Sequence, residues 1–223
     1  MWDFFREFYY MNLLLVIVSI ILIVYGIVNY KKLAGLRLFI IYALASLIQL
    51  LLVITTISLG KFDEYQNTLL IQSINYFVLL DFILLYFFLY KLLTSKKVRM
   101  GMKISFFTFI LFILYSFFLK DEIFKHPNII SLIEAFLIII PVLFYINQCL
   151  INLPFKRLSD NPEFWVIVGV LFLFSTITPL FLVNTFFPQM LYGSIYTLNY
   201  VSYTLLFICI LYAFICKTKQ ATS

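Results

Sequence analysis

The sequence predicts an all-α, polytopic membrane protein with seven transmembrane helices, its N-terminus outside and its C-terminus in the cytoplasm. Three observations support this prediction: the composition, the number and length of the apolar segments, and the distribution of the basic residues. Of the 223 residues, 64% are apolar and 12% are charged, whereas a soluble domain averages about 45–50% apolar and about 25% charged residues. A water-soluble fold cannot bury so much apolar surface, so lipid is the expected solvent.

Seven segments have the length that a membrane-crossing helix needs, about 20 mostly apolar residues for about 30 Å of hydrocarbon. Backbone groups inside a bilayer must be satisfied within each segment, which favours helices, and the alternation typical of a barrel is absent. We expect one membrane domain, residues 1–223, with no soluble domain on either side. The predicted spans are residues 9–30, 36–59, 69–93, 101–119, 129–150, 163–187 and 194–216.

The first predicted span is notable for the residues that precede it, and the second for a stripe of polar residues. The first follows an acidic, aromatic stretch, MWDFFREFYYMN, and no small-residue cleavage site follows its apolar run. A secretory signal begins with basic residues instead, so we expect span 9–30 to be retained. In the second span, polar residues recur at steps of four, three and seven, which places them on one helical face. These residues are Tyr42, Ser46, Gln49 and Thr56.

The later spans carry further polar groups. The third has Asp81 at its midpoint, in VLLDFILL, and basic residues join it to the fourth. The fifth contains Glu134, in SLIEAFLIIIP. In the sixth, Pro179 leaves the carbonyl of Ser175 without its helical donor and allows a kink. The seventh has a polar stripe in its outer half, formed by Tyr196, Asn199, Ser202 and Tyr203.

The orientation follows from the basic residues, which favour the cytoplasmic side of a membrane. Twelve Lys and Arg fall in the loops near 31–37, 91–103 and 151–162 and in the C-terminal tail. The opposite side has four, together with six of the ten acidic residues. These four are Arg6, Lys61, Lys120 and Lys125.

Asp81 is the first candidate for a functional residue, because all its helical neighbours three and four residues away are apolar. An ionised carboxylate at the centre of a bilayer costs from about 3 to more than about 10 kcal/mol. No Lys or Arg lies deep in the other six spans, which leaves protonation or hydrogen bonding to hydroxyls and amides. Two interpretations remain open: a functional switch, or a protonated acid that ties helices together.

Glu134 lies five or six residues into the fifth span and therefore nearer the outer side. It shares a helical face with Ser131 and Pro141. It either belongs to the same site as Asp81 or extends toward the outer interface as a partly solvated acid.

Polar residues concentrate at mid-depth and in the outer halves of the spans, which suits a polar cavity that opens outward with Asp81 near its floor. The alternative is that these side chains form scattered hydrogen bonds between helices, each worth about 0.6 kcal/mol or somewhat more. The candidate ligand-binding or proton-switch residues are Asp81, Glu134, Gln49, Gln72, Asn75, Ser175, Asn199 and Tyr203.

Patterns typical of enzymes and cofactor sites are absent from the sequence. The single histidine, His126, lies in a loop without a partner pattern, and there is no H-E-x-x-H motif, no second aspartate for an aspartyl dyad and no Gly-rich phosphate loop. We therefore expect no catalytic activity, cofactor or metal. The net charge of +6 belongs to the loops and does not indicate nucleic acid as a partner. The three cysteines, all inside apolar runs, are expected to be packing residues: Cys149, Cys209 and Cys216.

The stretch NPEFWVIVGVLFLFSTITP, residues 161–179, resembles the sixth-helix signature of small, poorly characterised bacterial seven-helix proteins. Similar modules resemble the membrane sensor portions of histidine kinases. The matching residues are Pro162, Phe164, Trp165 and Gly169. Two other seven-helix groups fit less well: microbial rhodopsins need a lysine in the seventh helix that this chain lacks, and sugar transporters of the three-plus-one-plus-three type have repeats that this chain does not show.

The resemblance implies a non-enzymatic receptor or sensor in the bacterial inner membrane. No output domain follows Cys216, so its signal is expected to pass to a separate membrane or cytoplasmic protein. Two alternatives stay open: a small-solute or proton-coupled transporter, and an integral subunit of a larger membrane complex.

Overall fold

The structure, a computed structural model, describes most of the chain as helices. The backbone is described for residues 2–58, 64–118, 127–151, 160–186 and 192–221, and the side chains within 12–55, 76–115, 129–151, 160–183 and 198–221. The α-helices are α1 (Trp2–Val28), α2 (Leu38–Ser58), α3 (Glu64–Leu92), α4 (Lys96–Phe118), α5 (Pro127–Ile151), α6 (Pro162–Phe186) and α7 (Tyr192–Gln220). A 3-10 turn, η1 (Tyr30–Lys32), lies between α1 and α2.

The described residues form seven α-helices and no strand, which confirms the predicted all-helical class. By length and composition, five helices (α2 and α4 to α7) can cross a membrane, and α1 adds a shorter apolar stretch, Asn12–Val28. The chain is therefore a multi-pass membrane protein. Several helices are longer than the predicted spans: α4 begins at Lys96 and α7 ends at Gln220. Hydropathy marks the part of a helix in hydrocarbon, whereas the backbone hydrogen bonds continue into the polar flanks.

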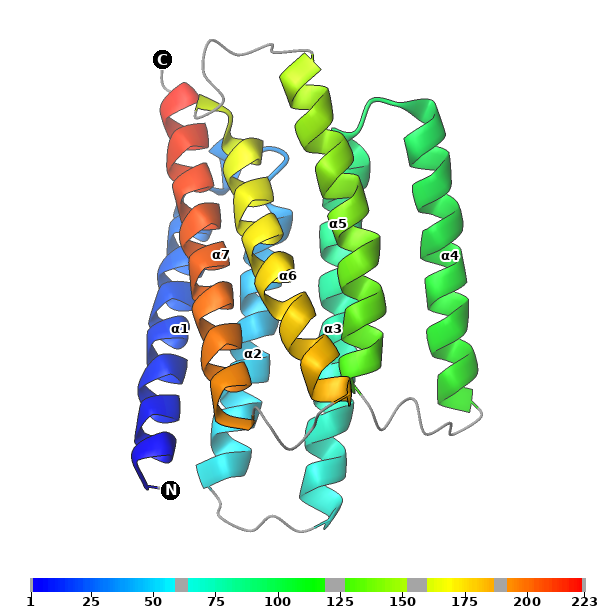
Figure 1. The fold of residues 1–223 in the computed structure, drawn as a ribbon. Coiled ribbons are helices and arrows are strands. Elements are labelled where there is room, and N and C mark those ends of the chain that lie inside the picture. The colour runs from blue at the N-terminus through cyan, green and yellow to red at the C-terminus, as the bar shows by residue number, and fades with distance from the viewer. Residues whose placement is uncertain (1, 59–63, 119–126, 152–159, 187–191, 222–223) are drawn as a thin grey trace.

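Six of the helices form a closed ring in the order α1, α2, α3, α5, α6 and α7, with α7 packed against α1. The most extensive packing is between α6 and α7. Helix α4 lies outside this ring, at one side of the bundle, where it packs loosely against α3 and α5 (Figure 1). Consequently α3 and α5 are direct neighbours although α4 separates them in the sequence.

Aromatic side chains fill the interior of the ring. Tyr42 of α2 meets Phe207 of α7 edge to face, with 5.8 Å between ring centroids, and Phe39 of α2 meets Phe88 of α3 at 4.7 Å. The outward faces are also apolar; for example, Leu111 remains 65% exposed. Apolar residues on both sides of a helix are expected where lipid is the solvent.

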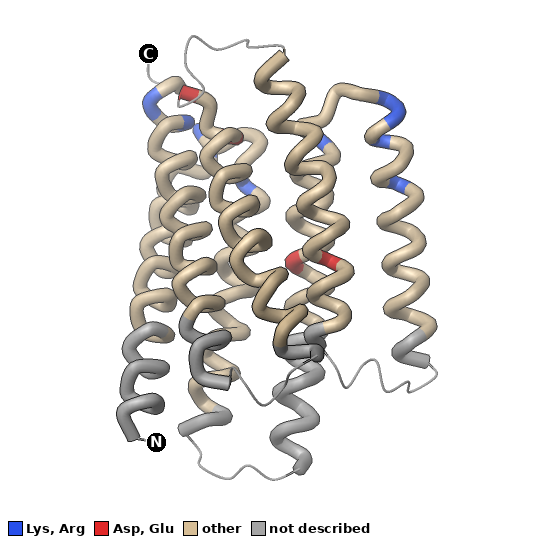
Figure 2. Tube along the Cα trace, viewed as in Figure 1, with Lys and Arg blue, Asp and Glu red and all other residues tan. Residues whose placement is uncertain are grey.

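Every Lys and Arg with a described side chain lies at or near one end of the bundle, the end that carries the C-terminus (Figure 2). We call this the basic end. Polar contacts tie its helices together: the Tyr25 hydroxyl of α1 lies 2.9 Å from Thr218 Oγ1 of α7, and Lys217 Nζ of α7 lies 3.2 Å from Glu163 Oε1 of α6. The basic end consists of Lys31, Lys32, Arg37, Lys91, Lys96, Lys97, Arg99, Lys103, Lys217 and Lys219.

Candidate functional site

Two carboxylic acids lie buried on adjacent helices, away from the basic end. Asp81 of α3 is 1% exposed and Glu134 of α5 is 3% exposed. They are close enough to interact electrostatically, and Figure 2 shows acidic positions on α3 and α5 at the same height in the bundle. We call Asp81 and Glu134 the carboxyl pair.

Helix α7 supplies a hydrogen-bond donor to this pair. The Tyr203 hydroxyl donates to Asp81 Oδ2 at 3.3 Å. The Tyr42 hydroxyl of α2 lies close to the same carboxyl but does not meet the geometry of a hydrogen bond. The ring of Phe77, one turn before Asp81, lies between these two tyrosines, with centroids 6.5 Å from Tyr42 and 6.3 Å from Tyr203. Four helices of the ring thus meet around one carboxyl pair.

The site has more buried hydrogen-bonding atoms than partners. Asp81 Oδ1, Glu134 Oε1 and the Tyr42 hydroxyl are buried and make no hydrogen bond in the structure. Within the described residues, no Lys or Arg forms an ion pair with either acid, since the single ion pair found there joins Lys217 to Glu163 at the basic end. Because unpaired buried acceptors cost free energy, this arrangement suits bound protons, a cation or water.

Two other residues that the sequence singles out lie on the helices that carry the tyrosines of the site. Asn199 is one turn before Tyr203 on α7, on the same face, and its buried Oδ1 also makes no hydrogen bond. Gln49 is half-buried on α2, seven residues beyond Tyr42. The side chains of Gln72 and Asn75 lie outside the described residues. The outward-opening cavity stays a prediction, because the outer turns that would form its walls are among these undescribed side chains.

Ser175 is not part of this cluster. It is exposed, and its hydroxyl donates at 3.2 Å to the carbonyl of Phe172 in its own helix. The neighbouring Thr176 donates to the same carbonyl at 2.8 Å. Hydroxyl groups that donate to a carbonyl of their own helix can face lipid. The Ser and Thr residues of the STITP segment therefore do not identify the inward face of α6.

Glu134 corrects one interpretation of the sequence. The reading of this residue as a partly solvated acid near the outer interface is contradicted by its burial beside Asp81. The sequence gives the depth of Glu134 only relative to the ends of its own span. Because α5 extends farther than α3 at the basic end (Figure 1), Glu134 lies level with Asp81 although it is near the start of α5. Tyr42 belongs to the site although it is not among the candidate residues expected from the sequence; its place in the polar stripe of the second span is the signal that points to it.

The NPEFW stretch has a structural explanation at the start of α6. Asn161 caps the helix, since its Oδ1 accepts from the backbone N–H of Glu163 at 3.0 Å, and Pro162 occupies the first helical position, where no N–H is needed. The Asn161 side chain also donates to the Tyr145 hydroxyl of α5 at 3.2 Å.

Gly169 allows the close approach of α6 and α7. A Cβ at this position would lie 2.9 Å from Cys209 Cβ and 3.2 Å from Leu206 Cα. Small residues commonly let membrane helices approach each other in this way. Asn161, Pro162 and Gly169 thus contribute to the packing of α6 against α5 and α7.

Comparison with known proteins adds no family to this picture. No protein-family model matches the chain, and no match is found among curated proteins or solved structures.

Proposed function

We propose that this chain is a seven-span membrane receptor or sensor in which the carboxyl pair binds a proton and thereby biases the packing of the ring. The observation that carries the proposal is the burial of Asp81 and Glu134 side by side without a cationic partner among the described residues. Two ionised carboxylates at such a site repel each other, and each loses several kcal/mol of solvation. One of them therefore holds a proton, as in carboxyl pairs that share one.

The change of one charge at this position favours one helix packing over another. Release of the shared proton adds a second buried charge between α3 and α5, whose cost falls when the helices separate or admit water. A difference of a few kcal/mol between two packings is enough to shift their populations. Tyr203, the donor to Asp81, extends the effect to α7.

The proposed topology has the N-terminus outside and the C-terminus in the cytoplasm, with α1 and α3 as the remaining spans. The support is the gathering of the described Lys and Arg at one end of the bundle (Figure 2), the end that faces the cytoplasm under the positive-inside rule. The proposed location is the bacterial inner membrane, in keeping with the sequence resemblance to small seven-helix sensor modules. The output passes to a separate membrane or cytoplasmic protein that contacts the basic end.

Infrared difference spectroscopy on the protein in lipid vesicles tests the proton switch. A change of pH is expected to produce a carbonyl-stretch band from a protonated buried carboxyl, together with amide bands from helix movement. Asp81→Asn and Glu134→Gln are each expected to remove or shift the carboxyl band while the protein stays folded. Glu163→Gln, at the basic end, is the matched control and leaves the band unchanged. A wild-type protein without such a band, or variants that retain it unaltered, would falsify the proposal.

A proton-coupled transporter is the second candidate, because the unpaired oxygens of Asp81, Glu134 and Asn199 also suit a translocated proton or cation. Flux into vesicles distinguishes the two. The transporter gives solute or proton flux that Asp81→Asn abolishes without any partner protein. The sensor gives no flux, and mass spectrometry of the protein purified from native membranes finds a stoichiometric signalling partner. Several structural membrane proteins in its place would indicate a subunit of a larger complex.

A further inference from the structure

Helices α4 and α5 enclose a groove of about 620 Å³ on the side of the bundle away from α1 and α7. Residues between Lys97 and Ser105 of α4 line one wall, residues between Leu137 and Phe144 of α5 line the other, and Tyr86 of α3 contributes from behind. The volume falls within the range of about 300–1,000 Å³ that is typical of ligand sites.

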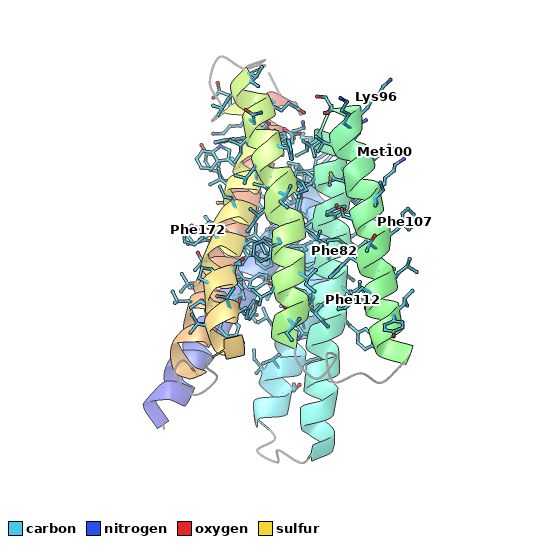
Figure 3. All side chains as sticks on the ribbon, turned by 45° about the vertical axis from the view of Figure 1, so that its right-hand side comes forward. Phe82, Lys96, Met100, Phe107, Phe112 and Phe172 are labelled. Carbon is cyan, nitrogen blue, oxygen red and sulfur yellow. The ribbon has the colours of Figure 1, made fainter. Side chains whose placement is uncertain are left out.

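The groove lies beside a helix that packs only loosely against both α3 and α5. Toward α3, its Phe106 and Phe109 pack on Phe82 with centroid distances of 5.7 and 4.5 Å. The Tyr86 hydroxyl adds a hydrogen bond of 3.0 Å to the carbonyl of Met102. Figure 3 shows Phe82 in the space between α3 and α4. No comparable aromatic contact between α4 and α5 is found among the described residues, and these two helices touch only loosely around the groove.

The lining combines one cation with a long apolar surface. Lys97, at the basic end, is the charged residue of the lining, and the α5 wall is apolar, with Pro141 buried and Phe144 47% exposed. At Gly101 the groove is open, since an added Cβ would meet no atom within 4 Å. From Lys97 to Ser105 the groove follows eight residues of helix, about 12 Å at about 1.5 Å per residue. This length is close to one leaflet, half of the roughly 30 Å of hydrocarbon in a bilayer.

We propose that this groove binds an anionic phospholipid from the leaflet at the basic end. Its phosphate lies at Lys97, and one acyl chain runs past Gly101 toward Pro141. A basic site between helices attracts acidic headgroups, and the apolar walls match a hydrocarbon chain. Water is a poor occupant of such walls, because it needs two to four polar partners. A helix of a partner protein, about 10 Å or more in diameter, would need an acidic side chain placed beside Lys97, whereas an anionic phospholipid carries its charge in the headgroup.

Native mass spectrometry of the purified protein, titrated in mild detergent with phosphatidylglycerol or with phosphatidylcholine of the same acyl chains, tests this proposal. The wild type is expected to retain phosphatidylglycerol preferentially. Lys97→Ala is expected to weaken its binding about fivefold, the effect of one lysine near a charged headgroup, and to leave phosphatidylcholine unchanged. Lys32→Ala, which removes a charge from the same end of the bundle outside the groove, is the matched control and leaves both affinities as they were.

A second variant tests the path of the acyl chain. Gly101→Leu adds a branched side chain where a Cβ meets no atom within 4 Å and directs it into the groove. The protein is expected to stay folded, and its affinity for both lipids is expected to fall at least tenfold. Equal wild-type binding of the two lipids, or unchanged phosphatidylglycerol binding by Gly101→Leu, would overturn the proposal. So would a dimer that forms in lipid-free detergent and that Gly101→Leu dissociates, because a second copy would then occupy the groove.

Discussion

The contact between α6 and α7 gives the most exact prediction, because two glycines inside helices provide opposite environments for one added methyl group. At Gly169 the new Cβ would lie 2.9 Å from Cys209 Cβ and 3.2 Å from Leu206 Cα, and the latter atom belongs to the backbone. At Gly101 it would meet no atom within 4 Å. Gly169→Ala therefore forces α6 and α7 apart, whereas Gly101→Ala changes helix propensity alone.

The magnitudes follow from these distances. Overpacking of a well-packed contact costs about 1–3 kcal/mol, and replacing glycine by alanine within a helix gains about 0.5–1 kcal/mol. Gly101→Ala is thus expected to raise the free energy of unfolding by about 0.5–1 kcal/mol. Both variants gain the same helix propensity. The free energy of unfolding of Gly169→Ala is therefore expected to be about 1–3 kcal/mol lower than that of Gly101→Ala.

The assay is denaturant unfolding in one detergent, followed by circular dichroism, with both variants and the wild type freed of lipid in the same way. Equal stabilities of Gly169→Ala and Gly101→Ala would refute the reasoning, because the contact between α6 and α7 would then not be as close as the structure places it. The reasoning would be strengthened if Gly169→Val lowered the free energy of unfolding more than Gly169→Ala, while Gly101→Val changed it little.

Three further predictions concern single polar contacts. Tyr203→Phe removes the donor to Asp81 and is expected to cost about 0.6–1.7 kcal/mol of unfolding free energy, the range of hydrogen bonds between membrane helices, whereas Tyr203→His, which keeps a donor, should recover part of it. Asn161→Ala is expected to cost about 1 kcal/mol, because α6 loses its N-cap; Asn161→Asp, which keeps the capping oxygen, should cost less. In a double-mutant cycle, Glu163 and Lys217 are expected to show a coupling of about 0.2–1 kcal/mol that weakens with salt, since both side chains are partly exposed; a coupling that does not depend on salt would contradict a solvent-screened pair.

Much of the fold could be predicted from the sequence, because hydropathy reports a strong and local physical requirement. Each apolar run of about 20 residues is long enough to cross hydrocarbon, and each forms its backbone hydrogen bonds within itself. The seven helices therefore lie where the apolar runs lie. The order of the helices in the ring could not be predicted in this way, because it depends on contacts between different spans. Helix α4, for example, is held against α3 by ring contacts of Phe106 with Phe82 and Tyr86, and no pattern within a single span reveals them.

The candidate site was partly predictable for the same reason. The cost of a charge in hydrocarbon identifies Asp81 and Glu134 one at a time, but their proximity depends on the relative positions of α3 and α5. Tyr203 was recognisable from its stripe, and the structure places it on Asp81. Ser175 shows the limit of this reasoning, because a hydroxyl can be satisfied by its own helix and then carries no information about the inward face.

The position of α4 connects the carboxyl pair with the groove. If α4 occupied the ring between α3 and α5, Asp81 and Glu134 would be separated by a helix diameter, about 10 Å or more, and would interact weakly. With α4 outside, the two acids lie close enough to interact electrostatically, and the groove between α4 and α5 is left for the proposed acyl chain. A proton-dependent change in the spacing of α3 and α5 then meets little resistance, because an acyl chain yields where packed side chains do not. Gly101→Leu, which replaces that occupant with a fixed side chain, is therefore expected to reduce the amide bands of the infrared difference spectrum and to leave the carboxyl band in place.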